Sequence, residues 1–183
     1  MARPFRFSAP DPGDDLVLRG RVQEVLAGRF ERRVTCLVAG AGFGKTTALV
    51  QAFEENRLRP LGSDLWLACS SEDADPWSFA RGLAVTGGCD DVESPDEVVG
   101  RLGERIGASS PDAVCLVLDD VQFLVGTPAL ALLDRLIGEL PSNAHVVLCG
   151  RRLPEVTLTR LELIGEAAVI GEELLAFDDT EAA

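Results

Sequence analysis

The chain has 183 residues, 46% of them hydrophobic and 26% charged, and its formal net charge is −13. That length allows one domain with a sizeable core, and the composition is typical of a soluble globular protein. The acidic charge argues against direct nucleic acid binding by this chain, because it repels phosphate backbones. No apolar run reaches the roughly 20 residues that span a bilayer, and the start lacks the apolar core of a signal peptide. We therefore expect a cytoplasmic protein with no membrane partner.

The predicted elements alternate between apolar strands and helices. A flexible lead-in is expected at 1–15, a single domain at 16–177, and the start of a further helix at 178–183. Strands are predicted at 33–40, 65–70, 114–120 and 145–152, with a short fifth strand within 167–175. Helices are predicted at 20–29, 45–57, 75–86, 94–107 and 127–140. Apolar strands that alternate with helices are typical of a parallel sheet covered on both faces, so we predict an α/β fold with a five-stranded parallel sheet.

The cysteines and the single histidine give no sign of metal or disulfide chemistry. No two cysteines form a CxxC pair, and His145 stands alone at the start of a predicted strand. We expect all five thiols to be small buried side chains in a reducing compartment. They are Cys36, Cys69, Cys89, Cys115 and Cys149, of which all but Cys89 fall in predicted strands.

The segment AGAGFGKT, residues 39–46, matches the P-loop pattern GxxxxGK[ST] except at Ala39, which stands in place of the first glycine. A predicted strand precedes it and a predicted helix follows it, as the pattern requires. In such a loop backbone N–H groups cradle phosphate oxygens, the lysine (here Lys45) reaches the β- and γ-phosphates, and the hydroxyl of Thr46 ligates magnesium. The alternative is a glycine-rich turn without a ligand. We predict ATP or ADP with Mg²⁺, bound by Gly40, Ala41, Gly42, Phe43, Gly44, Lys45, Thr46 and Thr47.

The segment VCLVLDD, residues 114–120, has the form of a Walker B strand. In this motif the carboxylate at the end of an apolar strand holds magnesium, which assigns the metal to Asp119 together with Thr46. Asp120 occupies the position from which many P-loop ATPases polarise the attacking water, so we predict a catalytic role for it. By itself a strand that ends in two aspartates indicates no more than a solvated strand end. Downstream of a P-loop, the pattern favours a magnesium nucleotide site.

Arg151 follows the fourth predicted strand directly. If that strand lies between the P-loop strand and the Walker B strand, Arg151 reaches the γ-phosphate and stabilises the charge that develops there. This second catalytic assignment predicts the strand order 5-1-4-3-2 in a three-layer P-loop NTPase fold. The alternative is that Arg151 and Arg152 form a solvated loop pair.

With these residues in place, the chain resembles the NTPase domain of MalT/LuxR-type (LAL) transcriptional regulators, in the AAA-like STAND class of P-loop ATPases. The resemblance runs from about Leu18 to the end of the chain. It implies that Leu18 and Arg19, in VLRGRV, contact the base, and that Arg160 joins Arg151 as a sensor arginine. It rests further on AGFGKTT, LWLACSSEDADPWSFARGL, VCLVLDDVQFL, VVLCGRRLPEVTLTRL and LLAFDDTEA.

The resemblance implies a signalling switch that binds ATP and hydrolyses it slowly with Mg²⁺. In the family this domain precedes a winged helix, a helical-repeat sensor region and often a DNA-binding helix-turn-helix. This sequence contains none of these, so we expect a fragment or stand-alone remnant whose partners are the other domains of the regulator or copies of itself. Two alternatives stay open. One is a small-molecule P-loop kinase, although no lid-like insertion follows the fourth strand. The other is a nucleotide-binding interaction domain that does not hydrolyse ATP.

Overall fold

The computed structural model describes residues 6–11, 13, 17–89, 92–154 and 158–176. The helix expected to start at 178–183 and most of the lead-in at 1–15 lie outside this part of the chain. Among the described residues, no helix has the length and apolarity needed to cross a membrane.

A five-stranded parallel sheet forms the centre of the molecule, in the order β2-β3-β4-β1-β5. This is the predicted order, 5-1-4-3-2, and it is confirmed. β4 pairs with β1 on one side, with Val146 opposite Val34, and with β3 on the other, with Val146 opposite Leu116. The loop after β4 therefore lies between the P-loop and the end of the Walker B strand. The strands are β1 (Val34–Val38), β2 (Ser63–Ala68), β3 (Val114–Asp119), β4 (Ala144–Gly150) and β5 (Ala167–Ile170).

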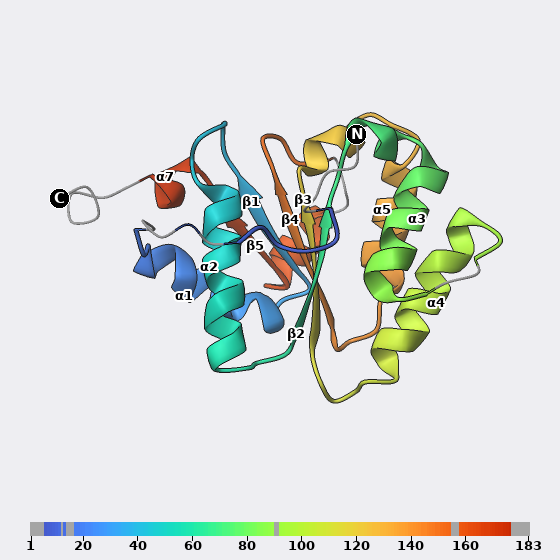
Figure 1. Cartoon of the computed structure of the whole chain (residues 1–183), viewed down its shortest axis with the longest axis horizontal. Coiled ribbons are helices and arrows are strands. Elements are labelled where there is room, and N and C mark those ends of the chain that lie inside the picture. The colour runs from blue at the N-terminus through green and yellow to red at the C-terminus, as the bar shows by residue number, and fades with distance from the viewer. Residues whose placement is uncertain (1–5, 12, 14–16, 90–91, 155–157, 177–183) are drawn as a thin grey trace.

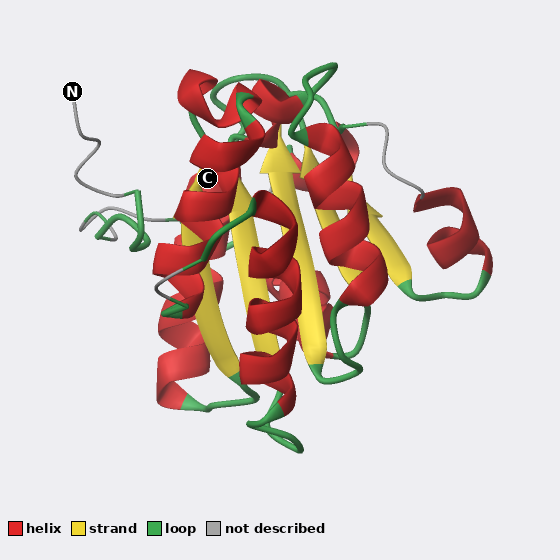
Figure 2. Cartoon of the chain, turned by 90° about the vertical axis from the view of Figure 1, so that its right-hand side faces the viewer, coloured by secondary structure: helices red, strands yellow, loops and turns green. Residues whose placement is uncertain are grey.

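Helices cover both faces of the sheet, which makes three layers (Figures 1 and 2). In Figure 1, α1, α2 and α7 lie on the left of the sheet, and α3, α4 and α5 lie on the right. The α-helices are α1 (Gly20–Ala27), α2 (Lys45–Leu58), α3 (Pro76–Gly87), α4 (Pro95–Gly107), α5 (Leu130–Glu139), α6 (Leu158–Leu163) and α7 (Glu172–Leu175). Short 3₁₀ helices are η1 (Gly28–Phe30), η2 (Ser71–Ala74) and η3 (Val121–Leu124).

Capping side chains begin two of the helices where the sequence predicts. Asp75 accepts a hydrogen bond from the backbone N–H of Ser78, and Ser94 accepts one from Glu97, so each satisfies an otherwise unpaired donor of the first turn. The helix expected at 127–140 is shorter than predicted, because α5 begins only at Leu130. The residues before α5 form a turn that includes Gly126, which has a φ of 69°.

The strands divide the core into two layers by their alternation. Leu116 and Leu118 face α3, α4 and α5, whereas Cys115 and Val117 face α1 and α2. All five cysteines are buried and free of disulfides, as expected. Cys69 lies just after the last residue of β2 rather than within it.

Candidate nucleotide-binding site

The P-loop, residues 39–44, leads from the carboxyl end of β1 into α2 (top of Figure 1). Gly42 and Gly44 have φ values of 85° and 68°, which side-chain-bearing residues rarely adopt. A Cβ at Gly44 would also lie 2.8 Å from Nη2 of Arg19. Ala39, the departure from the pattern, is buried at the end of β1, where its methyl group packs into the core beside α2. The structure therefore accommodates alanine at the first position.

The ammonium group of Lys45 lies inside this loop. Its Nζ donates hydrogen bonds to the carbonyl oxygens of Ala39, 2.7 Å away, and Gly40, 2.8 Å away. The only lysine of an acidic chain thus has its charge at the place where the pattern expects phosphates. Electrostatic attraction at this point offsets the repulsion of the protein's net charge.

Thr46 and Asp119, both predicted to bind the metal, meet across the P-loop and the end of β3. The hydroxyl Oγ1 of Thr46 donates to Oδ2 of Asp119 over 2.9 Å. Burial raises the pKa of the Asp119 carboxyl group, and hydrogen bonds from Cys149 and Thr46 act against this rise. A divalent cation would offset the buried negative charge, and hydroxyl and carboxylate oxygens are ligands that Mg²⁺ prefers. The pair therefore fits Mg²⁺.

Protein side chains alone would not complete the coordination of such a metal. Among the described residues, no cluster of three or more histidine, cysteine, aspartate or glutamate side chains could hold a metal ion. Mg²⁺ in nucleotide sites typically takes its remaining ligands from phosphates and water. The hydroxyl of Thr46 and the carboxylate of Asp119 are therefore the protein ligands expected for a metal ion that binds together with a nucleotide.

Asp120 and Arg151, the two predicted catalytic residues, lie at the carboxyl ends of neighbouring strands and share a contact with Gln122. Asp120 has a φ of 58°, and its own N–H donates to Oδ1 of Asp119 over 2.9 Å. Oδ1 of Asp120 accepts a hydrogen bond from Nε2 of Gln122, 2.9 Å away. Oε1 of the same carboxamide accepts one from the backbone N–H of Arg151, 3.0 Å away. No sequence pattern had indicated Gln122.

The side chain of Arg151 is exposed and is not packed in the core. Arg160 lies in α6, and its side chain is outside the described part of the chain. The roles of both as sensor arginines stay predictions.

Arg19 lies beneath the P-loop. The residue is 2% exposed, and its guanidinium donates to the carbonyl oxygens of Phe43 at 2.9 Å, Gly44 at 2.7 Å and Leu175 at 2.8 Å. Leu18 beside it is 60% exposed. Arg19 thus supports the loop through its carbonyl oxygens, and the base contacts of Arg19 and Leu18 stay predictions.

Glu172, at the start of α7, contacts the P-loop from the opposite end of the sequence. Its Oε1 accepts a hydrogen bond from the N–H of Gly40 over 2.9 Å. An acidic side chain at this place was not predicted, since no short motif joins residues 132 positions apart.

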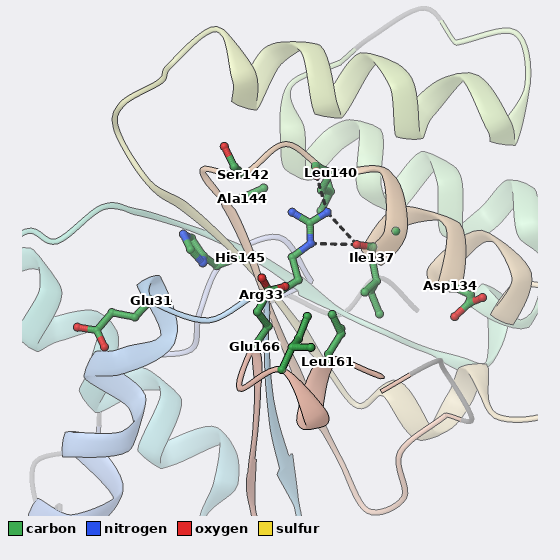
Figure 3. Close-up of a pocket in the computed structure, with 12 residues that line it drawn as sticks. Glu31, Arg33, Asp134, Ile137, Leu140, Ser142, Ala144, His145, Leu161 and Glu166 are labelled. Carbon is green, nitrogen blue, oxygen red and sulfur yellow. Dashed lines mark hydrogen bonds between the residues drawn. The ribbon is translucent and has the colours of Figure 1, made fainter. Parts of the chain in front are cut away.

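A cavity of about 690 Å³ lies at the other end of the sheet (Figure 3). Arg33, at its centre, donates from Nε and Nη2 to the carbonyl of Ile137, at 3.0 and 2.9 Å, and also to the carbonyls of Leu140 and Pro141. These bonds satisfy the last carbonyls of α5 and the residues after it. Because Ala144 in its wall begins β4, the cavity is at the amino end of the strands, remote from the P-loop.

No family model matches the chain. The HTH-type transcriptional regulator MalT of Yersinia enterocolitica is 25% identical over 201 residues, covering 100% of this chain and 21% of the regulator. MalT of Cronobacter sakazakii is likewise 25% identical over 200 residues, with the same coverage. The chain thus spans about a fifth of the length of the curated relatives it matches.

Solved structures show the same fold at lower sequence identity. Cdc6p of Pyrobaculum aerophilum has a TM-score of 0.61 at 17% identity and covers 88% of this chain and 47% of its own. A Signal Transduction ATPase with Numerous Domains (STAND) from Pyrococcus horikoshii, which has a tetratricopeptide repeat sensor, has a TM-score of 0.53 at 16% identity and covers 98% and 26%. The predicted resemblance is confirmed: this chain is similar in sequence to the MalT regulators and has the fold of a P-loop NTPase domain.

Proposed function

We propose that this chain is the ATP-binding switch domain of a MalT-like transcriptional regulator in the cytoplasm, and that it hydrolyses ATP slowly with Mg²⁺. The contact between Thr46 and Asp119 carries the proposal. It brings the hydroxyl that follows the P-loop lysine to the carboxylate that ends a buried apolar strand, which is the metal-binding arrangement of P-loop NTPases. The similarity to MalT supports the regulatory role.

The proposed chemistry divides among five side chains. Lys45 and the loop amides would bind the phosphates, and Thr46 with Asp119 would hold Mg²⁺, whose charge would offset that of the phosphate oxygens. Asp120 orients a water molecule for attack on the γ-phosphorus, and Arg151 stabilises the charge that grows on the γ-phosphoryl oxygens. The last two roles concern the transition state, so they affect turnover more than affinity.

Calorimetric titration of the chain with ATP and ADP, with and without Mg²⁺, tests the binding. Lys45→Ala should abolish it, because the loop then lacks the one point charge that attracts phosphates. Arg57→Ala is the matched control, since Arg57 lies on the same helix with 74% of its side chain exposed. Equal affinity of the parent and Lys45→Ala would refute the P-loop assignment.

Release of free phosphate separates the proposal from its alternatives. A slow switch releases phosphate without an acceptor, a kinase releases or transfers it only when an acceptor is added, and an interaction domain binds ATP without turnover. Asp120→Asn should still bind ATP with Mg²⁺ but hydrolyse it far more slowly, with a loss of about a hundredfold or more in kcat. Turnover at the parent rate would show that Asp120 is a solvated strand end.

We also propose that the partners of this domain are the further domains of a longer regulator or copies of itself. The relatives are about five times as long as the aligned region. One neighbour, the Orc1 protein of Aeropyrum pernix, was solved in complex with DNA; it has a TM-score of 0.56 and 21% identity, covering 86% of this chain and 46% of its own. The net charge of −13 argues against such a contact by this chain alone. A fluorescence titration with duplex DNA at low salt would detect it.

A further inference from the structure

We propose that Gln122 is a positioning residue that couples the carboxylate of Asp120 to the loop beginning at Arg151. The inference rests on the proposed function, because it concerns the water-activating and sensing groups of that site. Gln122 lies in η3, directly after the Walker B strand, and its side chain connects the ends of β3 and β4.

The chemistry of the partners fixes the orientation of the Gln122 carboxamide. A backbone N–H can only donate, so the atom 3.0 Å from the nitrogen of Arg151 must be the oxygen. An ionised carboxylate can only accept, so the atom 2.9 Å from Oδ1 of Asp120 must be the nitrogen. If the carboxamide were reversed, its NH₂ group would face the N–H of Arg151 and its oxygen would face the carboxylate of Asp120, so neither hydrogen bond could form. Both ends of one side chain are therefore used.

Gly150 provides the space for this side chain. A Cβ built at Gly150 would lie 2.8 Å from Oε1 of Gln122 and 3.0 Å from Cγ2 of Val121. Its backbone φ is not positive, so a side chain at this position would act by displacing the Gln122 carboxamide from its contacts and not through backbone strain. Gly150, buried at the end of β4, thus leaves room for the Gln122 carboxamide to reach the N–H of Arg151.

The contact joins the two groups that act on the γ-phosphate. Asp120 lacks the packing of a core residue and has a left-handed backbone, so the direction of its carboxylate depends on hydrogen bonds. Arg151 has an exposed side chain, but its backbone is held to Gln122. When the Arg151 side chain moves toward a γ-phosphate, the backbone of Arg151 shifts with it. The Gln122 carboxamide, bonded to that backbone, transmits the shift to the carboxylate of Asp120, which orients the water. Sensing and water activation thereby become coupled.

Kinetics of single and double variants of the chain test this coupling. Gln122→Ala should lower kcat for ATP hydrolysis at least tenfold and leave the dissociation constant of Mg-ATP within twofold. In the Asp120→Asn background the same substitution should change kcat by less than twofold, because Gln122 acts through Asp120. Equal fold losses in both backgrounds would overturn the proposal, as would a loss confined to affinity.

Gln122→Glu separates the two contacts. It keeps an acceptor for the N–H of Arg151 but sets a carboxylate against that of Asp120. It should therefore lower kcat as Gln122→Ala does while preserving the bond to Arg151. A Gln122→Glu variant with parental kcat would show that the contact with Asp120 does not matter.

Amide hydrogen exchange in the nucleotide-free chain gives a readout that needs no turnover. Gln122→Ala should increase the exchange rate of the Arg151 amide about tenfold, whereas Gln122→Glu and the surface control Arg57→Ala should leave it unchanged. Asp120→Gly, which tolerates the positive φ, should also increase it, although Asp120 does not bind that amide. Unchanged exchange in Gln122→Ala would refute the coupling. If the parent chain hydrolyses no ATP, the proposed function fails, while exchange at Arg151 still decides the coupling.

Discussion

Arg19 and Leu175, 156 positions apart in the sequence, are joined by a buried hydrogen bond of 2.8 Å from the guanidinium to the carbonyl oxygen. The same guanidinium donates to the carbonyl of Gly44 over 2.7 Å. One side chain thus connects the P-loop to α7, the last helix that the structure describes. The P-loop and the end of α7 therefore share one buried donor.

Arg19→Met should destabilise the chain and loosen α7. It leaves three carbonyl oxygens without their charged donor, so we expect the free energy of unfolding to fall by about 2–3 kcal/mol. Arg21→Met is the matched control, since Arg21 lies one residue into α1 and its contact with Ala176 is exposed and 3.4 Å long. Urea unfolding of both variants measures the difference. Equal effects would contradict a special role for Arg19.

Glu172→Gln should increase the affinity for ATP several-fold at low salt. The substitution removes a negative charge at the P-loop but keeps an oxygen that accepts the N–H of Gly40. Glu173→Gln changes the net charge equally, from the next position of the same short helix, so it controls for the overall field. Because Glu172 is exposed, the gain should shrink as salt is added. Calorimetry that finds the same affinity change in both variants would show that only net charge matters.

Asp64→Ala should cost about 3–5 kcal/mol of stability, because it leaves the buried guanidinium of Arg29 without its counter-charge. The two side chains are 2% (Arg29) and 7% (Asp64) exposed and form two parallel hydrogen bonds of 3.0 and 2.8 Å. Glu54→Ala, which breaks an exposed pair with Arg57 on α2, should cost no more than about 1 kcal/mol. The double variant Arg29→Met/Asp64→Leu should recover part of the loss, since no charge is then left unpaired. A double variant less stable than Asp64→Ala would contradict this account.

Local patterns predicted most of what positions the site. The P-loop and Walker B segments are short runs in which each residue type has a chemical reason, so Lys45, Thr46 and Asp119 could be assigned without a structure. The strand order was predicted from one long-range requirement, that Arg151 should reach the γ-phosphate. The observed sheet confirms this strand order.

The residues that the sequence did not reveal act through contacts between distant segments. Glu172 contacts Gly40 across 132 positions, and Gln122 contacts Arg151 across 29. Gln122 is only two residues from Asp120, but that spacing alone does not reveal its contact with Arg151, and Glu172 belongs to no motif of the site. The start of α5 was also predicted too early. The apolar pattern begins at residue 127, but the chain forms a turn after Gly126, which has a positive φ, and the helix begins only at Leu130. Such features follow only from the packed fold.

Asp119→Asn should remove the effect of magnesium on nucleotide binding. Asparagine keeps the shape and one acceptor oxygen, but it lacks the charge that attracts a divalent cation. We expect Mg²⁺ to tighten ATP binding in the parent and to change it less than twofold in the variant, while metal-free affinities stay similar. Titrations with Mg²⁺ and with a chelator measure this. A full magnesium effect in Asp119→Asn would move the metal site elsewhere.

The same substitution should stabilise the chain when nucleotide and metal are both absent. Burial raises the pKa of Asp119 in the folded state, so folding favours the protonated carboxyl group. The stability that this group contributes is present below its unfolded pKa and is lost as the pH rises through the folded pKa. At pH 7 with a chelator, Asp119→Asn should therefore unfold at a temperature higher by on the order of 2–4 °C. The difference should shrink as the pH falls toward and below the unfolded-state pKa of aspartate, because the stability that comes from the raised folded-state pKa is restored there. Asp112→Asn, at an exposed position, should show no such pH-dependent gain. A constant difference between pH 4 and pH 7 would mean that the buried charge of Asp119 does not limit stability.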